Sequence, residues 1–285
     1  MTVGSIDLHL HSTASDGECP PAEVVQQAQA AGLTTIALTD HDTLAGLEAA
    51  VQEGAARGVR VIAGCEFSVA ADWGEMHMLA YFLPVGDDGL NAFLAGQRDG
   101  RYRRAERIVE RLNKAGASVT VDAVLRESQG EAVGRPHVAR ALVNGGVVPD
   151  VDTAFRKYLG WRRPAFVPKE LPPLTEVTAL VREVGGVTSA AHLRDRASRS
   201  ALRRLREAGV DGVEVHHPAH DEARAQRIEA LAGEVGLLPT GGTDWHGDDV
   251  EMPNRAPLGS ITIPESWLAA VEALHEQRIS QLEAT

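Results

Sequence analysis

Two histidines stand two residues apart near the start of the chain, in "SIDLHLHSTASDG", and an aspartate follows them. An extended chain repeats its side-chain direction every second residue, so His9 and His11 project from one face. Asp16 follows "STAS" and belongs to the loop beyond the strand, from which it can fold back over the strand end. Imidazole is the commonest metal ligand, which makes a cation site one explanation. A strand with two polar residues facing solvent is the other, and this segment alone does not choose between them.

The elements that position these residues alternate between β-rich and amphipathic helical runs. Strands are expected at 5–11, 33–42, 59–69, 76–84, 186–193, 210–218 and 237–247. Helices are expected at 20–32, 43–58, 174–185, 200–209, 221–236 and 265–282. The link between 59–69 and 76–84 is too short for a crossover helix, so these two strands are predicted to form an antiparallel hairpin. The alternation elsewhere indicates a mostly parallel sheet, and seven strands favour an α/β barrel over an open sheet.

One long segment interrupts the alternation. Residues 91–173 are mostly helical, with runs at 90–116, 119–128, 135–146 and 151–160 and no comparable β-rich run. We therefore predict a barrel made of residues 1–90 and 174–285, with a small helical insertion at 91–173 packed over one end.

Titratable residues recur where the predicted strands end. They are His9, His11, Asp16, Asp40, His41, Asp42, Glu66, His192, Glu214, His216, His217, Asp244 and His246. His77 opens its strand, but the hairpin brings that start beside the end of the preceding strand. A barrel carries its chemistry at the carboxyl ends of its strands, and so many imidazoles and carboxylates there would repel or stay unsatisfied without cations. A metal centre is favoured over a set of solvated loop residues, although for His217, His220 and His275 we expect structural or surface roles.

Composition narrows the class of protein. The chain has 285 residues, 44% apolar and 24% charged, with a formal net charge of −12. That balance argues against a broad basic face for long nucleic acid but leaves room for a small basic pocket. Two cysteines, Cys19 and Cys65, form no disulfide framework or zinc motif, and no run is long and apolar enough for a membrane span. These features predict a cytoplasmic protein without a membrane association, and nothing implies a protein partner.

Several segments together resemble a known family. "DLHLHSTASDG", "LTDHDT", "GCEFS", "AAHL", "GVEVHHPAH" and "GGTDWHG" are similar, in this order, to the motifs of the PHP (polymerase and histidinol phosphatase) superfamily of metal-dependent phosphoesterases. "GRPHVARALV" and "KYLG…RPAFVPK" resemble the branch with nucleoside 3′,5′-bisphosphate phosphatases and small 5′-to-3′ exoribonucleases. The resemblance covers most of the chain. It implies a distorted seven-stranded (β/α) barrel and two to three divalent ions, Mn²⁺, Fe²⁺ or Zn²⁺.

The resemblance also implies a ligand set. One ion would take His9, His11, Glu66 and Asp244; the second would share Glu66 and add His77 and His192; the third would take Asp16, His41 and His246. Asp7, Asp40 and Asp42 are candidates for carboxylates that orient the histidines. The mixed nitrogen and oxygen ligands suit all three metals and do not choose among them.

The chain departs from the family pattern at two places. His192 is followed by Leu193 where many members have proline, so the loop there can run differently. Trp161, Arg162 and Arg163 stand where related sequences are richer in glycine, which leaves open how this loop meets a substrate base.

The expected reaction is metal-assisted hydrolysis of a phosphate ester, because ions can activate water and neutralise phosphoryl charge. The sequence has no Gly-x-Ser-x-Gly elbow and no Walker A loop. Arg135 is the first candidate for holding a second phosphate and Lys169 the next, since guanidinium and ammonium groups bind phosphate. His137 either contacts the ligand or shapes its helix start, and His216 and His220 either donate to phosphate or pack around Pro218. The alternating run at 98–114 is expected to be a solvated helix face.

Three functional hypotheses remain. The leading one is a phosphatase that converts a nucleoside 3′,5′-bisphosphate or similar small nucleotide to the 5′-monophosphate. The second is a 5′-to-3′ exoribonuclease on short RNA, with the same centre and a longer basic track. The third is a non-catalytic metal-binding module that regulates a partner.

Overall fold

A seven-stranded sheet forms the centre of the computed structural model, which describes residues 5–128, 132–248 and 256–284. Each strand pairs with the next one along the chain, from β1 to β7. Within the described residues, β4 alone runs against its neighbours, antiparallel to both β3 and β5, and the other pairs are parallel. A bridge between Leu10 and Trp245 joins the end of β1 to the segment after β7 and closes the sheet. The predicted α/β barrel and its antiparallel hairpin are therefore confirmed.

The strands are β1 (Ile6–Leu10), β2 (Thr35–Leu38), β3 (Arg60–Ala71), β4 (Gly74–Tyr81), β5 (Val187–Ala190), β6 (Gly212–His216) and β7 (Leu238–Gly241). The helices are α1 (Pro21–Ala30), α2 (Leu47–Arg57), α3 (Asp88–Lys114), α4 (Val121–Ser128), α5 (Arg135–Asn144), α6 (Val151–Ala154), α7 (Leu174–Glu183), α8 (Arg199–Glu207), α9 (Glu222–Val235) and α10 (Glu265–Glu283). A π-helical turn, η1 (Phe155–Leu159), continues α6, and a 3₁₀ turn, η2 (Arg194–Arg196), precedes α8.

The helices begin and end at residues whose chemistry favours a boundary. Proline at the first position starts α1, where the missing N–H costs nothing. The Asp221 side chain accepts a hydrogen bond from the Arg224 N–H and caps α9. Gly58 and Gly236 end α2 and α9 in the left-handed conformation, which glycine adopts without steric cost. These boundaries return the chain to the next strand in the same direction, which brings the carboxyl strand ends together.

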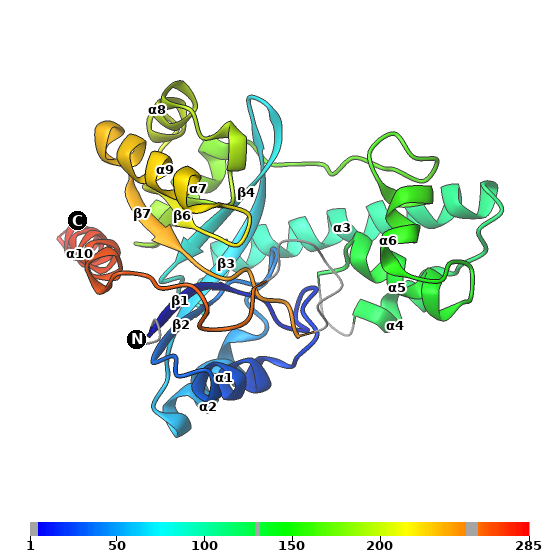
Figure 1. Cartoon of the computed structure of the whole chain (residues 1–285), viewed down its shortest axis with the longest axis horizontal. Coiled ribbons are helices and arrows are strands. Elements are labelled where there is room, and N and C mark those ends of the chain that lie inside the picture. The colour runs from blue at the N-terminus through cyan, green and yellow to red at the C-terminus, as the bar shows by residue number, and fades with distance from the viewer. Residues whose placement is uncertain (1–4, 129–131, 249–255, 285) are drawn as a thin grey trace.

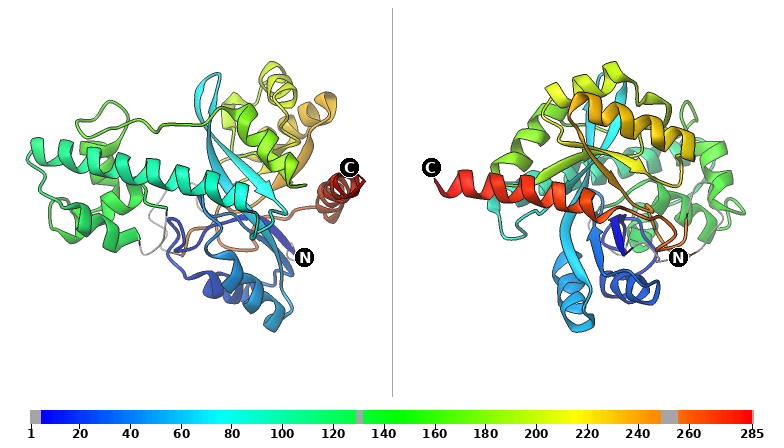
Figure 2. Two further views of the ribbon diagram at one scale, coloured as in Figure 1. Left: turned by 180° about the vertical axis from the view of Figure 1, so that it is seen from behind. Right: turned by 60° about the vertical axis from the view of Figure 1, so that its left-hand side comes forward.

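Helix α3 links two apolar cores. Leu90 and Leu94 in its first half pack in the barrel core, whereas Ala105, Ile108 and other residues of its second half pack in a separate cluster with α4, α5 and α6. Figure 1 shows α3 running outward from the barrel with α4, α5 and α6 at its far end, and Figure 2 shows the same arrangement from behind. The barrel is flanked by α1 and α2 on one side and by α7, α8 and α9 on the other (Figure 1). The helical character predicted for this segment is thus present, and we keep the name insertion for residues 91–173.

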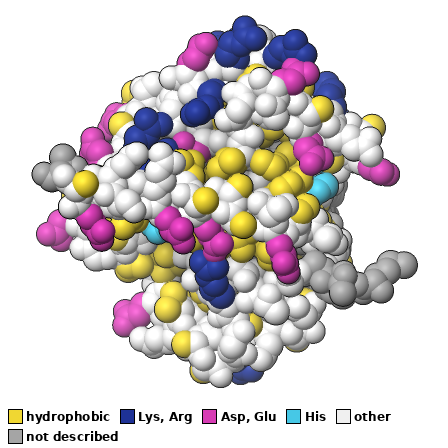
Figure 3. All heavy atoms as spheres, turned by 90° about the vertical axis from the view of Figure 1, so that its left-hand side faces the viewer, with side chains coloured by type: hydrophobic (Ala, Val, Ile, Leu, Met, Phe, Trp, Pro, Cys, Tyr) yellow, Lys and Arg dark blue, Asp and Glu magenta, His cyan; other side chains and the backbone are white. Residues whose placement is uncertain are grey.

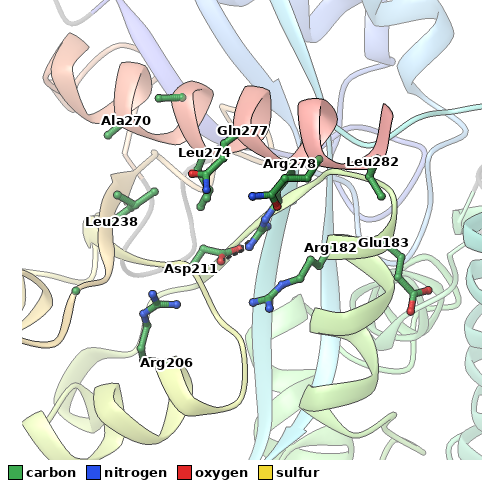
Figure 4. A pocket seen from close by; sticks show the side chains of 13 residues that line it. Arg182, Glu183, Arg206, Asp211, Leu238, Ala270, Leu274, Gln277, Arg278 and Leu282 are labelled. Atoms are coloured by element: carbon green, nitrogen blue, oxygen red, sulfur yellow. Dashed lines mark hydrogen bonds and ion pairs between the residues drawn. The ribbon is translucent and has the colours of Figure 1, made fainter. Parts of the chain in front are cut away.

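The end of α7 and the amino ends of β6 and β7 border a groove of about 860 Å³ under α10. Leu238, Leu274 and Leu282 form part of its apolar wall, and apolar side chains show in the hollow of this face, with charged groups on its borders (Figure 3). Arg278 of α10 reaches Asp211, which stands directly before β6 (Figure 4). The pair is almost fully buried and anchors the last helix to the barrel.

Candidate metal centre

The first two histidines of the sequence face one another at the carboxyl end of β1. His9 and His11 are fully buried, and their Nε2 atoms lie 3.1 Å apart. Glu66 of β3 approaches both rings with Oε2, 3.4 Å from His9 Nε2 and 3.2 Å from His11 Nε2. Asp244, after β7, does the same with Oδ1, at 3.3 and 3.2 Å. Four ligand atoms, carried by β1, by β3 and by the segments after β1 and β7, therefore converge on one point.

A cation satisfies this arrangement better than protons do. His9 Nδ1 donates to Glu214 Oε1 at 2.9 Å, so the neutral ring presents a lone pair at Nε2. His11 has one Nε2 proton at most for the acceptors around it, and its buried Nδ1 has no hydrogen-bond partner among the described residues. His41 Nδ1 is likewise buried and unpartnered by that measure. A buried polar atom without a hydrogen-bond partner costs free energy. An ion bound to these nitrogen and oxygen atoms would remove that cost, and the set of ligand atoms suits one.

A second group gathers on the loop after β1. Asp16 Oδ1 lies 3.4 Å from His246 Nε2, and Asp16 Oδ2 lies 3.9 Å from His41 Nε2. His246 Nδ1 donates to the Asp244 carbonyl at 2.8 Å, which leaves Nε2 free to bind a metal. The His11 ring stacks on His246 with centroids 4.1 Å apart and belongs to this group as well. The loop aspartate and two strand-end histidines thus meet, as the sequence led us to expect.

Glu66 connects a third group to the first. Its Oε1 lies 3.0 Å from both His77 Nδ1 and His192 Nε2, while Oε2 faces His9, His11 and His41. His77 stands opposite Ser68 in the antiparallel ladder of β3 and β4, which carries it to this rim. All nine predicted metal ligands consequently lie in one continuous cluster.

Burial and charge shift the pKa values of the cluster. Burial lowers the pKa of His11, but hydrogen bonds to Asp244 and Glu66 outweigh it and raise that pKa to about 10. Burial lowers the pKa of His41 to about 3 despite the nearby Glu66 and Asp16 charges. Burial also raises the pKa of Glu66 and Asp244, yet the surrounding histidines hold both well below the usual range. The carboxylates are thus held ionised, and the cluster favours positive charge beside them.

Backbone strain accompanies the cluster. Asp42, His192 and Asp244 adopt positive φ angles of 52°, 29° and 52°, a region that non-glycine residues rarely occupy. Each lies two to four residues beyond the end of the preceding strand. Such backbone conformations cost free energy and persist only where the surrounding structure enforces them. They cluster at functional sites.

Two of the carboxylates expected to orient the histidines, Asp7 and Asp40, accept hydrogen bonds from backbone and hydroxyl groups. Asp7 accepts hydrogen bonds from the Thr243 N–H and hydroxyl and from the His9 N–H, and so fixes the chain after β7. Asp40 accepts from the Ser12 and Ser15 hydroxyls at 2.6 Å each and shapes the loop that carries Asp16. These contacts run to backbone and hydroxyl groups, so both residues position loops.

Asp42 forms hydrogen bonds with the insertion and with β3. It pairs with Arg101 of α3, with Nε at 2.7 Å, and accepts from the Ser68 N–H. It therefore ties the insertion to the barrel.

Two residues at the end of β6 were missed or misassigned. Glu214 holds His9 Nδ1 and also accepts from the His192 N–H at 2.7 Å, which makes it the carboxylate that orients a histidine. His217, for which a structural role was expected, lies with Nε2 3.3 Å from Asp244 Oδ2 and completes a group with His9 and Glu214.

His216 was predicted to contact phosphate, but its ring stacks on Trp267 of α10, with centroids 4.9 Å apart. A register shift between Glu214 and His216 explains why His217, and not His216, faces the rim. The shift breaks the alternation that would place Glu214 and His216 on one face of the strand.

Two further histidines serve the backbone. His220 Nδ1 donates to the Val215 carbonyl and Nε2 accepts from the Arg194 N–H, so both nitrogens already have partners and the predicted phosphate contact lacks support. His275 was expected on the surface; instead its ring stacks on Phe82, and Nδ1 donates to the Gly185 carbonyl. Packing of α10 against the barrel accounts for this position.

The insertion brings cations to the rim. Most charged residues of 98–114 are exposed, as expected for a solvated helix face, but Arg101 and Arg104 are buried, with only 7% and 4% of their surface exposed. Arg104 Nε donates to the Val167 carbonyl, because segment 166–170 lies along α3. Lys169 Nζ pairs with Glu75 and donates to Ser68, both at 2.7 Å. Burial and the neighbouring Arg101 lower the pKa of Lys169 to about 8.

The start of α5 carries the other predicted contacts. The His137 Nδ1 accepts from the Gly134 N–H at 2.9 Å, so the ring shapes the helix start, and burial lowers its pKa to about 4. The Arg135 guanidinium lies 5.8 Å from the ring centroids of both Phe155 and Phe166. Arg135 is therefore held over aromatic faces, and it forms no ion pair with a carboxylate in the described part of the chain.

A closed α/β barrel with buried imidazoles and carboxylates at its carboxyl rim defines a metal-dependent hydrolase. Comparison with known proteins agrees. Residues 7–144 match the PHP domain family. The chain is 34% identical over 252 residues to a 3′,5′-nucleoside bisphosphate phosphatase of Chromobacterium violaceum, covering 86% of this chain and 88% of that one. It is 32% identical over 247 residues to the 5′-3′ exoribonuclease Rnm of Escherichia coli, covering 84% of each.

The structural likeness is equally broad. A structure described as a metal-dependent phosphoesterase from Bifidobacterium adolescentis superposes with a TM-score of 0.85 at 31% identity, over 95% of this chain and 96% of that one. The chain belongs to the PHP family of metal-dependent phosphoesterases, which hydrolyse phosphoric ester bonds. Among the described residues, no helix has the length and apolar character needed to cross a membrane.

Proposed function

We propose that this chain is a cytoplasmic phosphatase that converts nucleoside 3′,5′-bisphosphates to nucleoside 5′-monophosphates and inorganic phosphate. Two to three divalent ions, Mn²⁺, Fe²⁺ or Zn²⁺, would serve as cofactors. The ligands we assign are His9, His11, Glu66 and Asp244 for one ion, Glu66, His77 and His192 for the second, and Asp16, His41 and His246 for the third.

The observation that carries the substrate proposal is a set of cations beside a metal rim. Arg101, Arg104 and Lys169 are held in or near the protein interior, and Arg135 lies next to them at the start of α5. Burying so much positive charge is costly unless an anion uses it. Arg101 and Lys169 already have the carboxylates Asp42 and Glu75, whereas Arg104 is bound to a carbonyl and Arg135 to aromatic rings. Arg135 and Arg104 are thus available for a phosphate that does not react, and Lys169, which Glu75 and Ser68 hold in place, is the next candidate.

The reaction needs water, a phosphorus atom and a leaving oxygen. Divalent ions, when bound, lower the pKa of a water ligand and offset charge on phosphoryl oxygens. In the overall step the water oxygen bonds to phosphorus, the bond from phosphorus to the 3′ oxygen breaks, and the 3′ oxygen takes up a proton. The protein's part is to hold its groups in place: Glu214 orients His9, and His217 orients Asp244. Both contacts fix which nitrogen or oxygen faces the centre.

A second candidate is 5′-to-3′ exoribonuclease activity on short RNA. In a bisphosphate and in a 5′-phosphorylated RNA, the bond that breaks joins phosphorus to the 3′ oxygen of the first nucleoside. The two substrates differ in whether that phosphate also carries a following nucleoside. The similarity to an exoribonuclease across 84% of the chain favours keeping this candidate. The third hypothesis, a non-catalytic metal-binding module, is set aside because the relatives that span the chain are enzymes.

Purified protein loaded with Mn²⁺ tests the proposal on adenosine 3′,5′-bisphosphate and on a 5′-phosphorylated pentaribonucleotide. We expect phosphate release from the bisphosphate, and an Asp244→Asn variant should lose it. A charge-matched change at the exposed Glu229, Glu229→Gln, should behave as wild type. Release of nucleotides from the oligomer with equal or greater efficiency would move the assignment to the exoribonuclease, and inactivity on both substrates would refute it.

A further inference from the structure

We infer that Glu75 is a positioning residue that couples the insertion to the metal centre. One oxygen of its carboxylate, Oε1, faces both Lys169 of the insertion and His77 of the rim. When a phosphate takes Lys169 as its partner, this oxygen is left to His77, and the ring then holds its ion more tightly. The inference rests on the proposed function, because it takes Lys169 as a phosphate contact and His77 as a metal ligand.

His77 lies between two carboxylates. Its Nδ1 is 3.0 Å from Glu66 Oε1, and its Nε2 is 3.5 Å from Glu75 Oε1. Glu75 and His77 stand two residues apart on β4, so their side chains project from the same face of the strand. A neutral ring with its proton on Nε2 presents a lone pair at Nδ1, toward the carboxylate that the proposed ions share. Glu75 can therefore orient His77 in the way that Glu214 orients His9.

Lys169 is the closer partner of the same oxygen. Its Nζ lies 2.7 Å from Glu75 Oε1 and donates to the Ser68 hydroxyl, also at 2.7 Å. An ammonium group forms a stronger hydrogen bond with a carboxylate than a neutral imidazole does. The contact from His77 is correspondingly long, because 3.5 Å is beyond the usual range of a hydrogen bond. Lys169 thus competes with His77 for Glu75.

The backbone fixes Lys169 at this place. On one side of it, the Val167 carbonyl is bound by a side chain of α3. On the other side, the Pro172 carbonyl accepts a hydrogen bond from the Ala70 N–H at 2.9 Å. Ala70 is the residue opposite Glu75 in the ladder of β3 and β4. Because the segment is anchored on both sides, the Lys169 side chain can change its partner while the backbone stays in place.

Such a competition makes phosphate binding and metal binding support each other. A phosphate bound to Lys169 releases Glu75 to His77, and an ion bound by His77 draws Glu75 toward the ring and releases Lys169 to a phosphate. Coupling between two binding sites acts equally in both directions. The substrate would therefore strengthen the metal site on which its own hydrolysis depends.

Titration of the metal-stripped protein with Mn²⁺ tests the inference without substrate. Glu75→Gln should weaken the affinity for one ion about 10- to 100-fold. Glu75→Asp keeps the charge on a shorter side chain and should recover part of the affinity. Asp72→Asn is the matched control, because Asp72 lies in the same hairpin but pairs with Arg204 of α8, and it should bind Mn²⁺ as the wild type does. Wild-type Mn²⁺ affinity in Glu75→Gln would overturn the inference.

A double-variant cycle tests the competition itself. Lys169→Met removes the competing partner and should tighten Mn²⁺ binding about fivefold. In the Glu75→Gln background the same change should give a much smaller gain, since no carboxylate is left to move. An equal gain in both backgrounds would mean that only the loss of a nearby positive charge matters, and this would overturn the inference.

Adenosine 5′-monophosphate, the proposed product, gives a second readout, because it carries the phosphate that does not react. It should tighten Mn²⁺ binding about fivefold more in the wild type than in Glu75→Gln or Lys169→Met. The same effect in all three proteins would contradict the coupling. Inactivity of the wild type on adenosine 3′,5′-bisphosphate would refute the proposed function instead, and the Mn²⁺ titrations would still decide whether Glu75 joins Lys169 to the metal site.

Discussion

The two ends of the barrel treat buried charge in opposite ways. At the amino end, Asp211 accepts from the Thr188 N–H and hydroxyl and forms two hydrogen bonds with Arg278, at 2.9 and 2.5 Å. At the carboxyl end, buried imidazoles face carboxylates and one another, and His11 Nδ1 and His41 Nδ1 have no hydrogen-bond partner among the described residues. A buried ion pair whose hydrogen bonds are all made keeps two elements together. A buried polar atom without a hydrogen-bond partner indicates a ligand such as an ion. The amino end of the barrel therefore stabilises the fold, and the carboxyl end carries the chemistry.

The largest loss of activity from a change at the carboxyl end should come from Glu66→Gln. Glu66 contacts every group of the rim, so neutralising it removes the carboxylate that the proposed ions share. We expect kcat to fall about 10³-fold, in the range that loss of one key electrostatic group produces. The rise in melting temperature on adding Mn²⁺ should shrink as well. Glu229→Gln is the matched control, and normal activity in Glu66→Gln would contradict the division of roles.

Arg278→Ala should show the opposite signature. It leaves Asp211 buried without its cation, and we expect the free energy of unfolding to fall by about 3–5 kcal/mol. The folded fraction should keep wild-type kcat, because the pair lies at the far end of the strands. Denaturant unfolding followed by circular dichroism measures the loss, with exposed Arg203→Ala as the control. A fall in kcat without a loss of stability would mean that the amino end also takes part in the reaction.

Glu214→Gln probes the support of the rim. The carboxylate holds His9 in the tautomer that presents Nε2, and an amide can donate to Nδ1 and reverse it. We expect Mn²⁺ affinity to weaken about 10- to 100-fold, with activity recovered at high Mn²⁺. Isothermal titration calorimetry measures the affinity. Unchanged binding would show that His9 needs no such orientation.

Lys169 gives a smaller effect that depends on pH. Its lowered pKa of about 8 means that the folded protein loses this positive charge as pH rises through about 8, well before an ordinary lysine does. Folding disfavours the protonated form, so this group makes the protein more stable as pH rises above 8. For a phosphate ligand the sign is opposite, and KM for the bisphosphate should rise about tenfold above that pH as one charge-assisted hydrogen bond is lost. Lys169→Arg stays charged and should flatten the profile; the same rise in this variant would exclude Lys169 as its cause.

Sequence reasoning worked where a side-chain direction follows from local geometry. Period two placed His9 and His11 on one face, and the short link between β3 and β4 brought His77 to the rim. The alternation of helices and strands was enough to predict the barrel, because parallel strands bring their carboxyl ends together.

It failed where a local irregularity or a distant segment decides the outcome. The register shift in β6 turned His217 toward the rim and His216 toward Trp267, and alternation cannot reveal such a shift. The burial of Arg101 and Arg104 depends on Asp42 and on segment 166–170, far away in the sequence. An alternating charge pattern reads the same whether or not another segment covers it.

The most direct test of the central claim is the metal content of the purified chain, measured by elemental analysis together with bisphosphate turnover. We predict two to three Mn²⁺, Fe²⁺ or Zn²⁺ ions per chain, loss of activity after chelation, and recovery on reloading with Mn²⁺. A folded His9→Ala, Asp244→Ala double variant should bind fewer ions and remain inactive. Full activity in that variant, or in the chelated protein, would contradict a metal centre at this rim.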